Sequence, residues 1–435
     1  MPEELISSRP KILLTEGSST SSRQTLYALG GRYQIDAMDP AWLCQARFSR
    51  FVRKIWRCPP FGKDPGGYLR RLLEVLTGQH YDVLFPTHEQ VYLASRFREQ
   101  FAQLAAVAVP PFEALERLLS KVAFVELLDE LGLPHPPTRV VSGRQLPQAV
   151  REFPIFLKVD FSTAGEGVRF VTDQEQLQRV LTEFESRGWL DDQTQVLVQN
   201  PARGIKGAVS GVFQDGQLVA YHCDEALALG VGGSTLARVT VDDPLSIRHL
   251  QIIGAHLNWH GPLAIEVFRD KQTGSVEYLE CNPRIGETFN PTLAGVNFCE
   301  VMVRISCGQN VEPLPPPRIG VKTHQGFLGL MATALRDGTR RAVFRELMRW
   351  LAKAPPYADA EDELMRPRED WLSVLPAFAV TVQLLLWPGW ARRIVRKTVE
   401  NYALTAATLE KIRKLQWPQP EANSASSSPP TRHGS

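Results

Sequence analysis

The sequence predicts an α/β protein with an N-terminal open parallel sheet, a mainly antiparallel two-lobe region and a mainly helical C-terminal extension. Near the N-terminus, apolar strands alternate with helical or irregular stretches, which is the pattern of an open α/β sheet. Further along, short apolar runs follow one another across turns and glycine loops, which favours antiparallel pairing. Beyond Asn310 the composition changes, and the proline-rich run 313–317 indicates a semi-rigid connector to the extension.

The composition argues against several classes of protein. The chain has 435 residues, of which 43% are hydrophobic and 22% charged, as in an ordinary globular protein of several domains. The net charge of +2 and the lack of a basic stripe interleaved with aromatics argue against a nucleic-acid partner. The six cysteines lack C-x-x-C spacing, so neither zinc nor a disulfide framework is indicated. Residues 1–11 contain no apolar signal segment, so we expect a cytoplasmic protein.

The first strand is expected at Lys11–Thr15, followed by the polar turn Glu16–Ser22 and a helix that ends at Leu29. The turn lacks G-x-G-x-x-G, so a dinucleotide fingerprint is absent. Its Gly, Ser and Thr donors at a helix N-terminus suit an anion, although a serine-rich turn more often only caps its helix. Further short strands of this region are expected at Tyr33–Met38, Asp82–Pro86 and Ala105–Pro110.

A lysine and a glycine loop come next. The apolar strand Pro154–Val159 carries Lys158 and runs into the loop 160–168, which holds hydroxyls and glycines. Small residues let backbone N–H groups approach an anion and a lysine supplies a point charge, so the arrangement is typical of a phosphate site. A β-hairpin turn has the same pattern, and both interpretations stay open. The flanking elements are expected at Leu119–Leu131 (helix), Arg169–Thr172 (strand), Asp173–Arg187 (helix) and Gln195–Gln199 (strand), with a hinge at Asn200-Pro201.

The most informative segment is the strand 277–284, which places a carboxylate, an amide and a guanidinium close together. A preceding strand, Ala264–Phe268, carries Glu266 among apolar neighbours, where a charge is costly unless it is paired or bound to a cation. The turn Asp270–Gly274 between them predicts that Glu266 and Glu280 lie on one face of the sheet. The other elements of this region are expected at Gly207–Phe213, Gln217–His222 and Arg238–Val241 (strands) and Pro244–Leu257 (helix).

Glu280 and Asn282 share that face because side chains alternate along a strand. Carboxylate and amide oxygens at this spacing suit Mg²⁺, and Arg284 on the same side is placed to clamp a phosphoryl oxygen. A salt-bridged hairpin is the alternative for this segment. Cys281, inside the strand, is interpreted as a small buried thiol and not as a nucleophile.

Taken together, these segments resemble the ATP-grasp superfamily, nearest to its carboxylate–amine ligases of the carbamoyl-phosphate-synthetase-like type. The resemblance covers roughly residues 10–310, and its most specific element is Leu279–Arg284, which matches the family's metal strand Glu-x-Asn-x-Arg. It implies the following divisions: a flexible tail (1–9), a pre-ATP-grasp α/β domain (10–118), a small lobe (119–200), a large lobe with the metal site (201–310), a C-terminal extension (311–415) and a disordered tail (416–435).

The resemblance also implies roles for individual residues. Glu266 and Glu280 would bind one Mg²⁺, and Glu280 with Asn282 a second, with Mn²⁺ as an alternative ion. ATP would be the nucleotide, and the residues implied to stabilise the transferred phosphoryl group are Arg284, Arg238 and Lys158. Those implied to hold the nucleotide are Lys121, Lys158, Ser162, Thr163, Gly165, Gly167, Gln199 and Asn200.

The sequence departs from the family pattern at four points, one of which is Ala226–Leu229, where relatives often carry an arginine and a proline before the glycine loop. Asn200 replaces the acid of the usual Gln-Glu hinge, Lys121 follows Ser120 where an aspartate is common, and Glu166 lies where relatives often show a basic residue. None of these changes removes an implied metal ligand, so we expect an active enzyme.

The chemistry implied is the phosphorylation of a carboxylate by ATP, followed by attack of an amine on the acyl-phosphate. Small-molecule carboxylate and amine substrates are therefore the expected partners, and homodimerisation is left open. The alternatives are a nucleotide-binding regulatory protein without turnover and a carboxylase that uses a small acceptor. Candidate contacts for the substrates are Ser18–Ser22, His88-Glu89, Glu287, Thr288 and Asn290.

The segment Trp371–Trp390 contains no charged residue and approaches the length of a membrane span, roughly 20 residues. Pro376, Gln383 and Pro388 interrupt it, and a basic cluster follows at once. Three interpretations remain: a packed helical subdomain, which is favoured, an interfacial membrane anchor over 371–397, and a true span. The basic cluster consists of Arg392, Arg393, Arg396 and Lys397.

Overall fold

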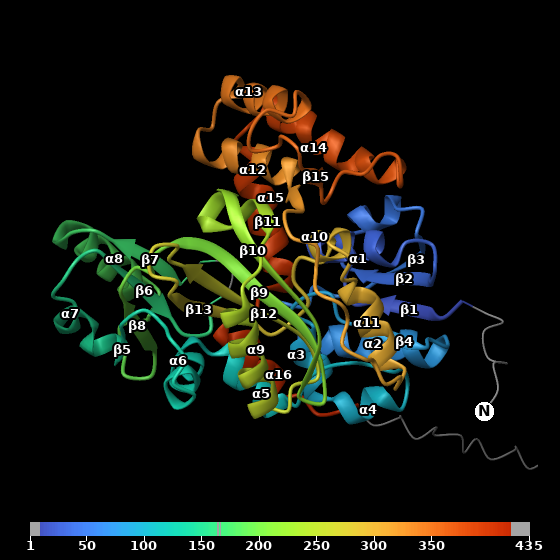
Figure 1. The fold of residues 1–435 in the computed structure, drawn as a ribbon, viewed down its shortest axis with the longest axis horizontal. Coiled ribbons are helices and arrows are strands. Elements are labelled where there is room, and N and C mark those ends of the chain that lie inside the picture. Colours follow the sequence, from blue (N-terminus) through green and yellow to red (C-terminus); the bar gives the residue numbers. More distant parts are fainter. Residues whose placement is uncertain (1–8, 163–164, 166, 419–435) are drawn as a thin grey trace, which may run out of the picture.

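The computed structural model describes residues 9–162, 165 and 167–418, and three β-sheets organise them (Figure 1). A parallel sheet near the N-terminus and a small antiparallel sheet flank a large, mainly antiparallel one. This architecture confirms the predicted α/β class and the helical C-terminal extension. Thr163, Ala164 and Glu166 of the glycine loop lie outside the described residues, as do 1–8 and 419–435 of the two expected tails.

The N-terminal sheet is parallel, with the strand order β3-β2-β1-β4. Its central strand β1 is fully buried at Ile12, Leu13 and Leu14, as expected for a parallel sheet covered on both faces. The edge strand β3 is not predicted from the sequence because charged residues interrupt its apolar ones. Ala105–Pro110 is not a strand, and contributes one isolated bridge. The elements are β1 (Lys11–Leu14), α1 (Thr20–Leu29), β2 (Gln34–Asp39), β3 (Val52–Arg57), α2 (Pro65–Gly78), β4 (Val83–Phe85), α3 (Val91–Arg96) and α4 (Arg98–Ala102).

The small sheet is antiparallel, with the order β5-β8-β6-β7. Ile155, Leu157 and Val159 of β6 face an apolar cluster shared with α8, whereas Lys158 alternates to the opposite face. The elements are α5 (Phe112–Leu119), α6 (Lys121–Glu130), β5 (Thr138–Ser142), α7 (Leu146–Ala149), β6 (Ile155–Val159), β7 (Val168–Val171), α8 (Gln174–Ser186) and β8 (Gln195–Gln199).

The large sheet has the order β13-β12-β9-β10-β11-β14-β15, and all its pairings are antiparallel except β14 with β15. The last two strands come from the C-terminal extension, so the extension completes this sheet. The elements are β9 (Ile205–Gln214), β10 (Gln217–Leu229), β11 (Thr235–Thr240), α9 (Pro244–His256), β12 (Gly261–Arg269), β13 (Val276–Asn282), α10 (Phe289–Leu293), α11 (Phe298–Ser306), β14 (Lys322–His324) and β15 (Glu361–Asp362).

The helices of the extension form a packed unit, in agreement with the favoured interpretation of 371–390. Helices α12, α13 and α14 bury an apolar cluster together with Ala391 of α15, and α16 returns to pack against α2 (Figure 1). The uncharged segment is broken between Leu386 and Trp390. Among the helices of the described residues, none combines the length and apolarity that a membrane crossing requires. The elements are α12 (Gly326–Arg336), α13 (Arg340–Leu351), α14 (Leu375–Leu386), α15 (Trp390–Tyr402) and α16 (Ala406–Lys414).

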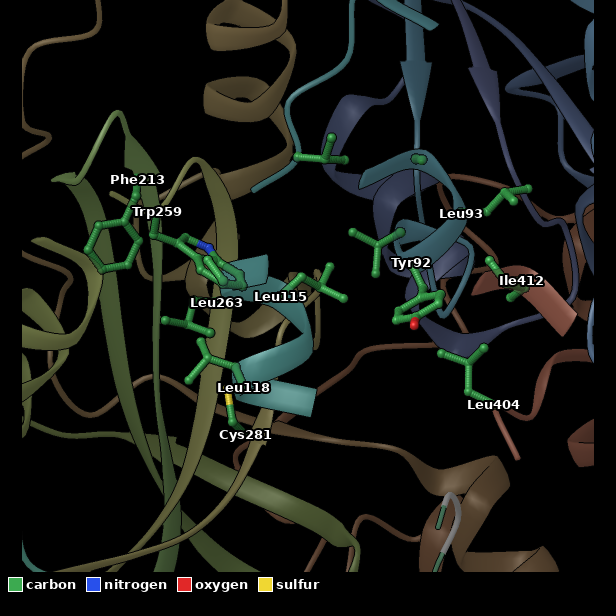
Figure 2. Packing of buried hydrophobic residues seen from close by; sticks show 14 of the residues in the cluster. Tyr92, Leu93, Leu115, Leu118, Phe213, Trp259, Leu263, Cys281, Leu404 and Ile412 are labelled. Carbon is green, nitrogen blue, oxygen red and sulfur yellow. The ribbon is translucent and has the colours of Figure 1, made fainter. Parts of the chain in front are cut away.

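One apolar cluster joins the N-terminal region, the large sheet and the chain's C-terminal helices. Figure 2 shows Trp259 beside the helix that carries Leu115 and Leu118, with Tyr92 on the far side of that helix. The buried Cys281 lies at the same core, and burial raises the pKa of its thiol well above the ordinary value. Other members of this cluster that Figure 2 labels are Leu93, Phe213, Leu263, Leu404 and Ile412.

Candidate active site

A pair of carboxylates faces away from this core. Glu266 of β12 and Glu280 of β13 are direct cross-strand partners, and Asn282 lies opposite Ala264 in the same register. Their neighbours Ile265 and Cys281 are buried in the core, so alternation directs the polar side chains to the other face. The sheet therefore brings the three expected metal ligands together on one face.

Three lysines surround the carboxylate pair. Lys206 Nζ lies 2.9 Å from Oε2 of Glu266, and Lys121 Nζ lies 3.9 Å from Oε1 of Glu280. Lys158 is buried, and desolvation lowers the pKa of its ammonium to about 8 although Glu280 and Glu266 oppose the shift. Desolvation raises the pKa of Glu266, and Lys206 counteracts part of that effect. The cluster joins the small sheet and its neighbouring helix α6 to the large sheet.

Lys206 is a site residue that the sequence analysis does not identify. It is the second residue of β9, between Ile205 and Gly207. A lysine within an apolar strand is the signal that singles out Lys158, but the strand predicted here begins at Gly207, one residue after Lys206.

Lys121 is the first residue of α6, and Asp160 fixes this helix end. Asp160 accepts hydrogen bonds from the Ser120 hydroxyl at 2.9 Å and from the Lys121 backbone N–H at 2.7 Å. The Lys121 ammonium donates to the Ser162 carbonyl at 2.7 Å. Ser120 replaces the family's common aspartate here, and Asp160 on the neighbouring segment supplies a carboxylate at the same helix end.

In the described part of the glycine loop, hydrogen bonding and close packing constrain the backbone. Ser162 Oγ donates to the Val159 carbonyl at 2.9 Å. A Cβ added at Gly167 would come within 2.5 Å of the Ser162 side chain, so this position requires glycine. Gly165 has φ 73°, a conformation that glycine adopts without strain. The loop thus joins β6 to β7 beside Lys121.

Gln199 and Asn200 lie where the chain passes from the small sheet to the large one. Gln199 is the last residue of β8, is buried, and donates to Thr138 Oγ1 at 2.8 Å. Asn200 is exposed, and its backbone N–H donates to the Pro137 carbonyl at 2.9 Å. Their nucleotide contacts stay a prediction.

Arg284 connects the metal strand to the N-terminal region. Its Nε lies 3.1 Å from Oε1 of Glu89, and an Nη donates to Asn282 Oδ1 at 3.1 Å. A cavity of about 30 Å³ lies at this contact. Its polar lining comes from all three parts of the chain and consists of Glu89, Lys121, Ser162, Glu280, Asn282 and Arg284. The neighbouring His88 is buried against the ring of Tyr402.

Arg238 belongs to a second buried cluster. Its guanidinium lies 3.1 Å from Glu363, 3.5 Å from Asp224 and 3.9 Å from Glu287. Gln24 of α1 hydrogen-bonds Glu287 and the backbone of Thr288, so this cluster joins α1, the large sheet and the extension. The role of Arg238 in phosphoryl transfer stays a prediction.

Two of the candidate substrate contacts have structural partners. Asn290 is fully buried and hydrogen-bonds Thr240 and Thr323. In the serine-rich turn, Ser19 caps α1 by accepting from the Ser22 backbone N–H at 3.1 Å. Both residues are therefore used in holding the fold together.

The carboxylate site fits Mg²⁺ and a nucleotide by the chemistry of its donors. Two carboxylates and an amide offer the hard oxygen ligands that this ion prefers, and the lysines can neutralise phosphate oxygens. In the described part of the chain, no group of three or more His, Cys, Asp or Glu side chains is placed to hold a metal. An ion at Glu266 and Glu280 would therefore take its other ligands from Asn282, phosphate or water.

Curated relatives of the chain include large chains of carbamoyl phosphate synthase. The chain is 20% identical over 246 residues to the carbamoyl phosphate synthase large chain of Archaeoglobus fulgidus, covering 53% of this chain and 22% of that protein. It is 24% identical over 232 residues to the large chain of Mycobacterium tuberculosis strain H37Rv, covering 49% and 20%. The chain thus spans about a fifth of the length of these relatives. No protein-family model matches the sequence.

Solved structures share the fold over most of the chain. An N5-carboxyaminoimidazole ribonucleotide synthetase in its ADP complex aligns with a TM-score of 0.56 and 17% identity, covering 76% of this chain and 85% of its own. The L-amino acid ligase of Bacillus licheniformis aligns with a TM-score of 0.53 and 14% identity, covering 70% and 76%. The biotin carboxylase of Campylobacter jejuni aligns with 0.56 and 15%, covering 72% and 74%. These relatives and structural neighbours are ATP-grasp proteins, and the chain shares the fold of the solved ones.

Proposed function

We propose that the protein is an ATP- and Mg²⁺-dependent ligase that activates a carboxylate as an acyl-phosphate and joins it to an amine, releasing ADP and phosphate. The observation that carries this proposal is the cross-strand pair Glu266–Glu280 facing Lys121, Lys158 and Lys206. Two carboxylates with three lysines beside them, from α6, β6 and β9, can bind a metal ion and a polyphosphate together. The ligases among the relatives and structural neighbours support the same class of reaction.

Each residue of the site then has a physical task. Phosphoryl transfer depends mainly on positioning and on neutralising charge. Lys121 and Lys158 would neutralise phosphate oxygens, and Arg284 would stabilise the transferred phosphoryl group. Mg²⁺, when bound, would supply further charge neutralisation between the phosphates. Glu266, Glu280 and Asn282 would hold the ion. The proposal includes a second ion bound by the same residues.

The second candidate reaction is carboxylation, in which bicarbonate replaces the organic acid. It is favoured by the biotin carboxylase and carboxyaminoimidazole synthetase among the structural neighbours. The same carboxylates, lysines and Arg284 would serve this reaction, because both routes begin with phosphorylation of a carboxyl oxygen. A regulatory protein that binds ATP without turnover is the third candidate.

The test is ADP and phosphate release by the purified protein with Mg²⁺-ATP, pooled carboxylic acids, pooled amines and bicarbonate, each added and omitted in turn. Release that requires one acid pool and one amine pool, and that Glu280→Ala abolishes, is the expected result. Release with bicarbonate in place of the acid pool would establish the carboxylase. ATP binding without release under every combination would establish the regulatory protein.

We also propose that the outer face of α14 binds an anionic membrane surface. Phe378 of α14 is 65% exposed, and Trp371 and Trp387, which flank the helix, are 64% and 56% exposed, so a large apolar surface faces solvent here. Exposed cations follow directly on α15, which gives the face the aromatic and basic character of an interfacial helix. A second copy of the chain is the competing occupant of this face, and would make the protein a homodimer.

A further inference from the structure

A second, larger cavity lies at the carboxyl ends of β1 and β2. It measures about 220 Å³, room for a small organic molecule, since a water molecule takes about 30 Å³ in the liquid. Ligands of open α/β sheets bind beyond the carboxyl ends of the strands, so the position is a natural one. Its polar lining includes Thr15, Glu16, Ser18, Asp39, Gln90 and Lys397.

Glu16 lines this cavity and is 5% exposed, yet its Oε2 atom has no hydrogen-bond partner. A buried carboxyl oxygen without a partner is costly, and natural folds rarely keep one without a use. Asp39, on the same wall, is different, because its two oxygens accept from the backbone N–H groups of Gly17 at 3.2 Å and Ala41 at 2.7 Å. Glu16 therefore offers a free acceptor beside a second, fixed carboxylate.

The cavity is adjacent to the site of phosphoryl transfer proposed above. Gln90 lines the larger cavity, whereas its neighbour Glu89 lines the smaller one and holds Arg284. Arg284 and Glu89 are also among the charges that act on Glu16. The two cavities thus flank a single short segment of chain.

We propose that this cavity binds the amine substrate, a small molecule whose ammonium group is held by Glu16 and balanced by the charge of Asp39. The inference rests on the proposed ligase function. An anion is disfavoured because two carboxylates face the cavity and because the first turn of α1 is already capped by Ser19. Lys397 of α15 also lines the cavity, so an amine that carries a carboxylate would find a cation there for that group.

The pKa of Glu16 is set by its surroundings. Desolvation first, and then Asp39, raise the pKa of Glu16 to about 8, while Gln90 and Arg284 partly oppose the rise. Burial beside Asp39 thus favours the neutral acid near neutral pH. An ammonium group beside Oε2 would restore the carboxylate, since an opposite charge in contact lowers the pKa of an acid.

The proposal is tested by calorimetric binding without nucleotide, using L-lysine, L-arginine, ethanolamine and putrescine as probes. Ethylene glycol and 1,4-butanediol replace the amines of the last two by hydroxyls. We expect at least one amine to bind, its diol counterpart not to bind, and Glu16→Gln to weaken binding at least about tenfold, as the loss of a charge-assisted hydrogen bond predicts. Glu185→Gln, on the exposed side of α8, is the matched control and should bind as the wild type does.

Binding of no amine, or equal binding by Glu16→Gln, would overturn the proposal. Should Glu16→Gln fail to fold, Ile394→Trp fills the cavity from the α15 side, and unimpaired binding by that variant would overturn the proposal equally. Turnover separates the two levels of inference. A ligase whose KM for the amine is unchanged in Glu16→Gln would keep the proposed function and reject this cavity. Amine binding that requires Glu16, in a protein that shows no turnover, would support this cavity and reject the proposed function.

Discussion

The guanidinium of Arg238 lies 3.1 Å from Oε1 of Glu363, and this ion pair joins the large sheet to the C-terminal extension. Both side chains are buried, Glu363 completely. Glu363 also accepts hydrogen bonds from the buried Thr323 hydroxyl and Gln325 amide, so removing it leaves these donors without this acceptor, which costs about 1–3 kcal/mol. Glu363→Ala should therefore lower the free energy of unfolding by about that amount, measured by urea denaturation. Equal stability of this variant and the wild type would contradict the structural role of the pair.

The control for this prediction is Glu361→Ala, two residues before Glu363 in the chain. Glu361 is exposed and pairs with Arg366 at 3.2 Å, and surface pairs of this kind contribute about 0–1 kcal/mol. The same logic applies to the catalytic role predicted for Arg238. Because Arg238 pairs with Glu363, Asp224 and Glu287, the variant Arg238→Met should lower the free energy of unfolding even without any ligand. If Arg238 were only catalytic, this variant would lower turnover and leave stability unchanged.

Glu280 is expected to be indispensable for nucleotide chemistry. It is the carboxylate that both proposed ions share, so Glu280→Gln should lower ADP release by about 10²–10³-fold, the effect of losing one strong electrostatic contact in a transition state. Glu277→Gln on the same strand, whose carboxylate accepts from the Arg203 backbone, should leave turnover unchanged. Full turnover by Glu280→Gln would remove the metal site from this strand.

The sequence predicts the site better where the signal is local. Glu280, Asn282 and Arg284 lie within one strand, so alternation alone places them on a common face. Lys121 and Lys158 are matched by the family resemblance. Asp160, which fixes the start of α6, is outside the reach of such patterns because its partners are distant in sequence.

For the fold, too, local patterns are predicted from the sequence and long-range contacts are not. Buried strands such as β1 are predicted correctly from their apolar runs, whereas β3, an edge strand with interspersed charges, is not predicted. The two strands that the extension adds to the large sheet are very short, and their pairing with β11 is a long-range contact that no local pattern encodes. For the same reason the cavity at Glu16 is invisible in the sequence, since α15 supplies part of its wall.

Glu16 should make stability depend on pH. Burial raises its pKa from 4.5 to about 8, so its neutral form stabilises the fold fully below the unfolded-state pKa, and this contribution is lost as pH rises through about 8. Glu16→Gln cannot ionise, so its melting temperature should exceed that of the wild type at pH 9 and approach it at pH 5. The facing charges of Asp39, Glu89, Arg284 and Lys397 are unchanged in this variant. A difference in melting temperature that did not grow with pH would contradict the buried state of this acid.

The outer face of α14 should bind anionic vesicles. Apolar side chains insert at the interface while basic residues attract the lipid charge, so we expect co-flotation with phosphatidylserine-containing vesicles, weak binding to phosphatidylcholine alone, and release as salt rises. Phe378→Ser with Trp387→Ser should abolish binding and leave ATP binding intact. Ile319→Ser, a comparably exposed apolar residue outside the extension's helices, is the control. A face used by a second copy would behave differently: the wild type would sediment as a dimer, the double variant as a monomer, and neither would float with vesicles.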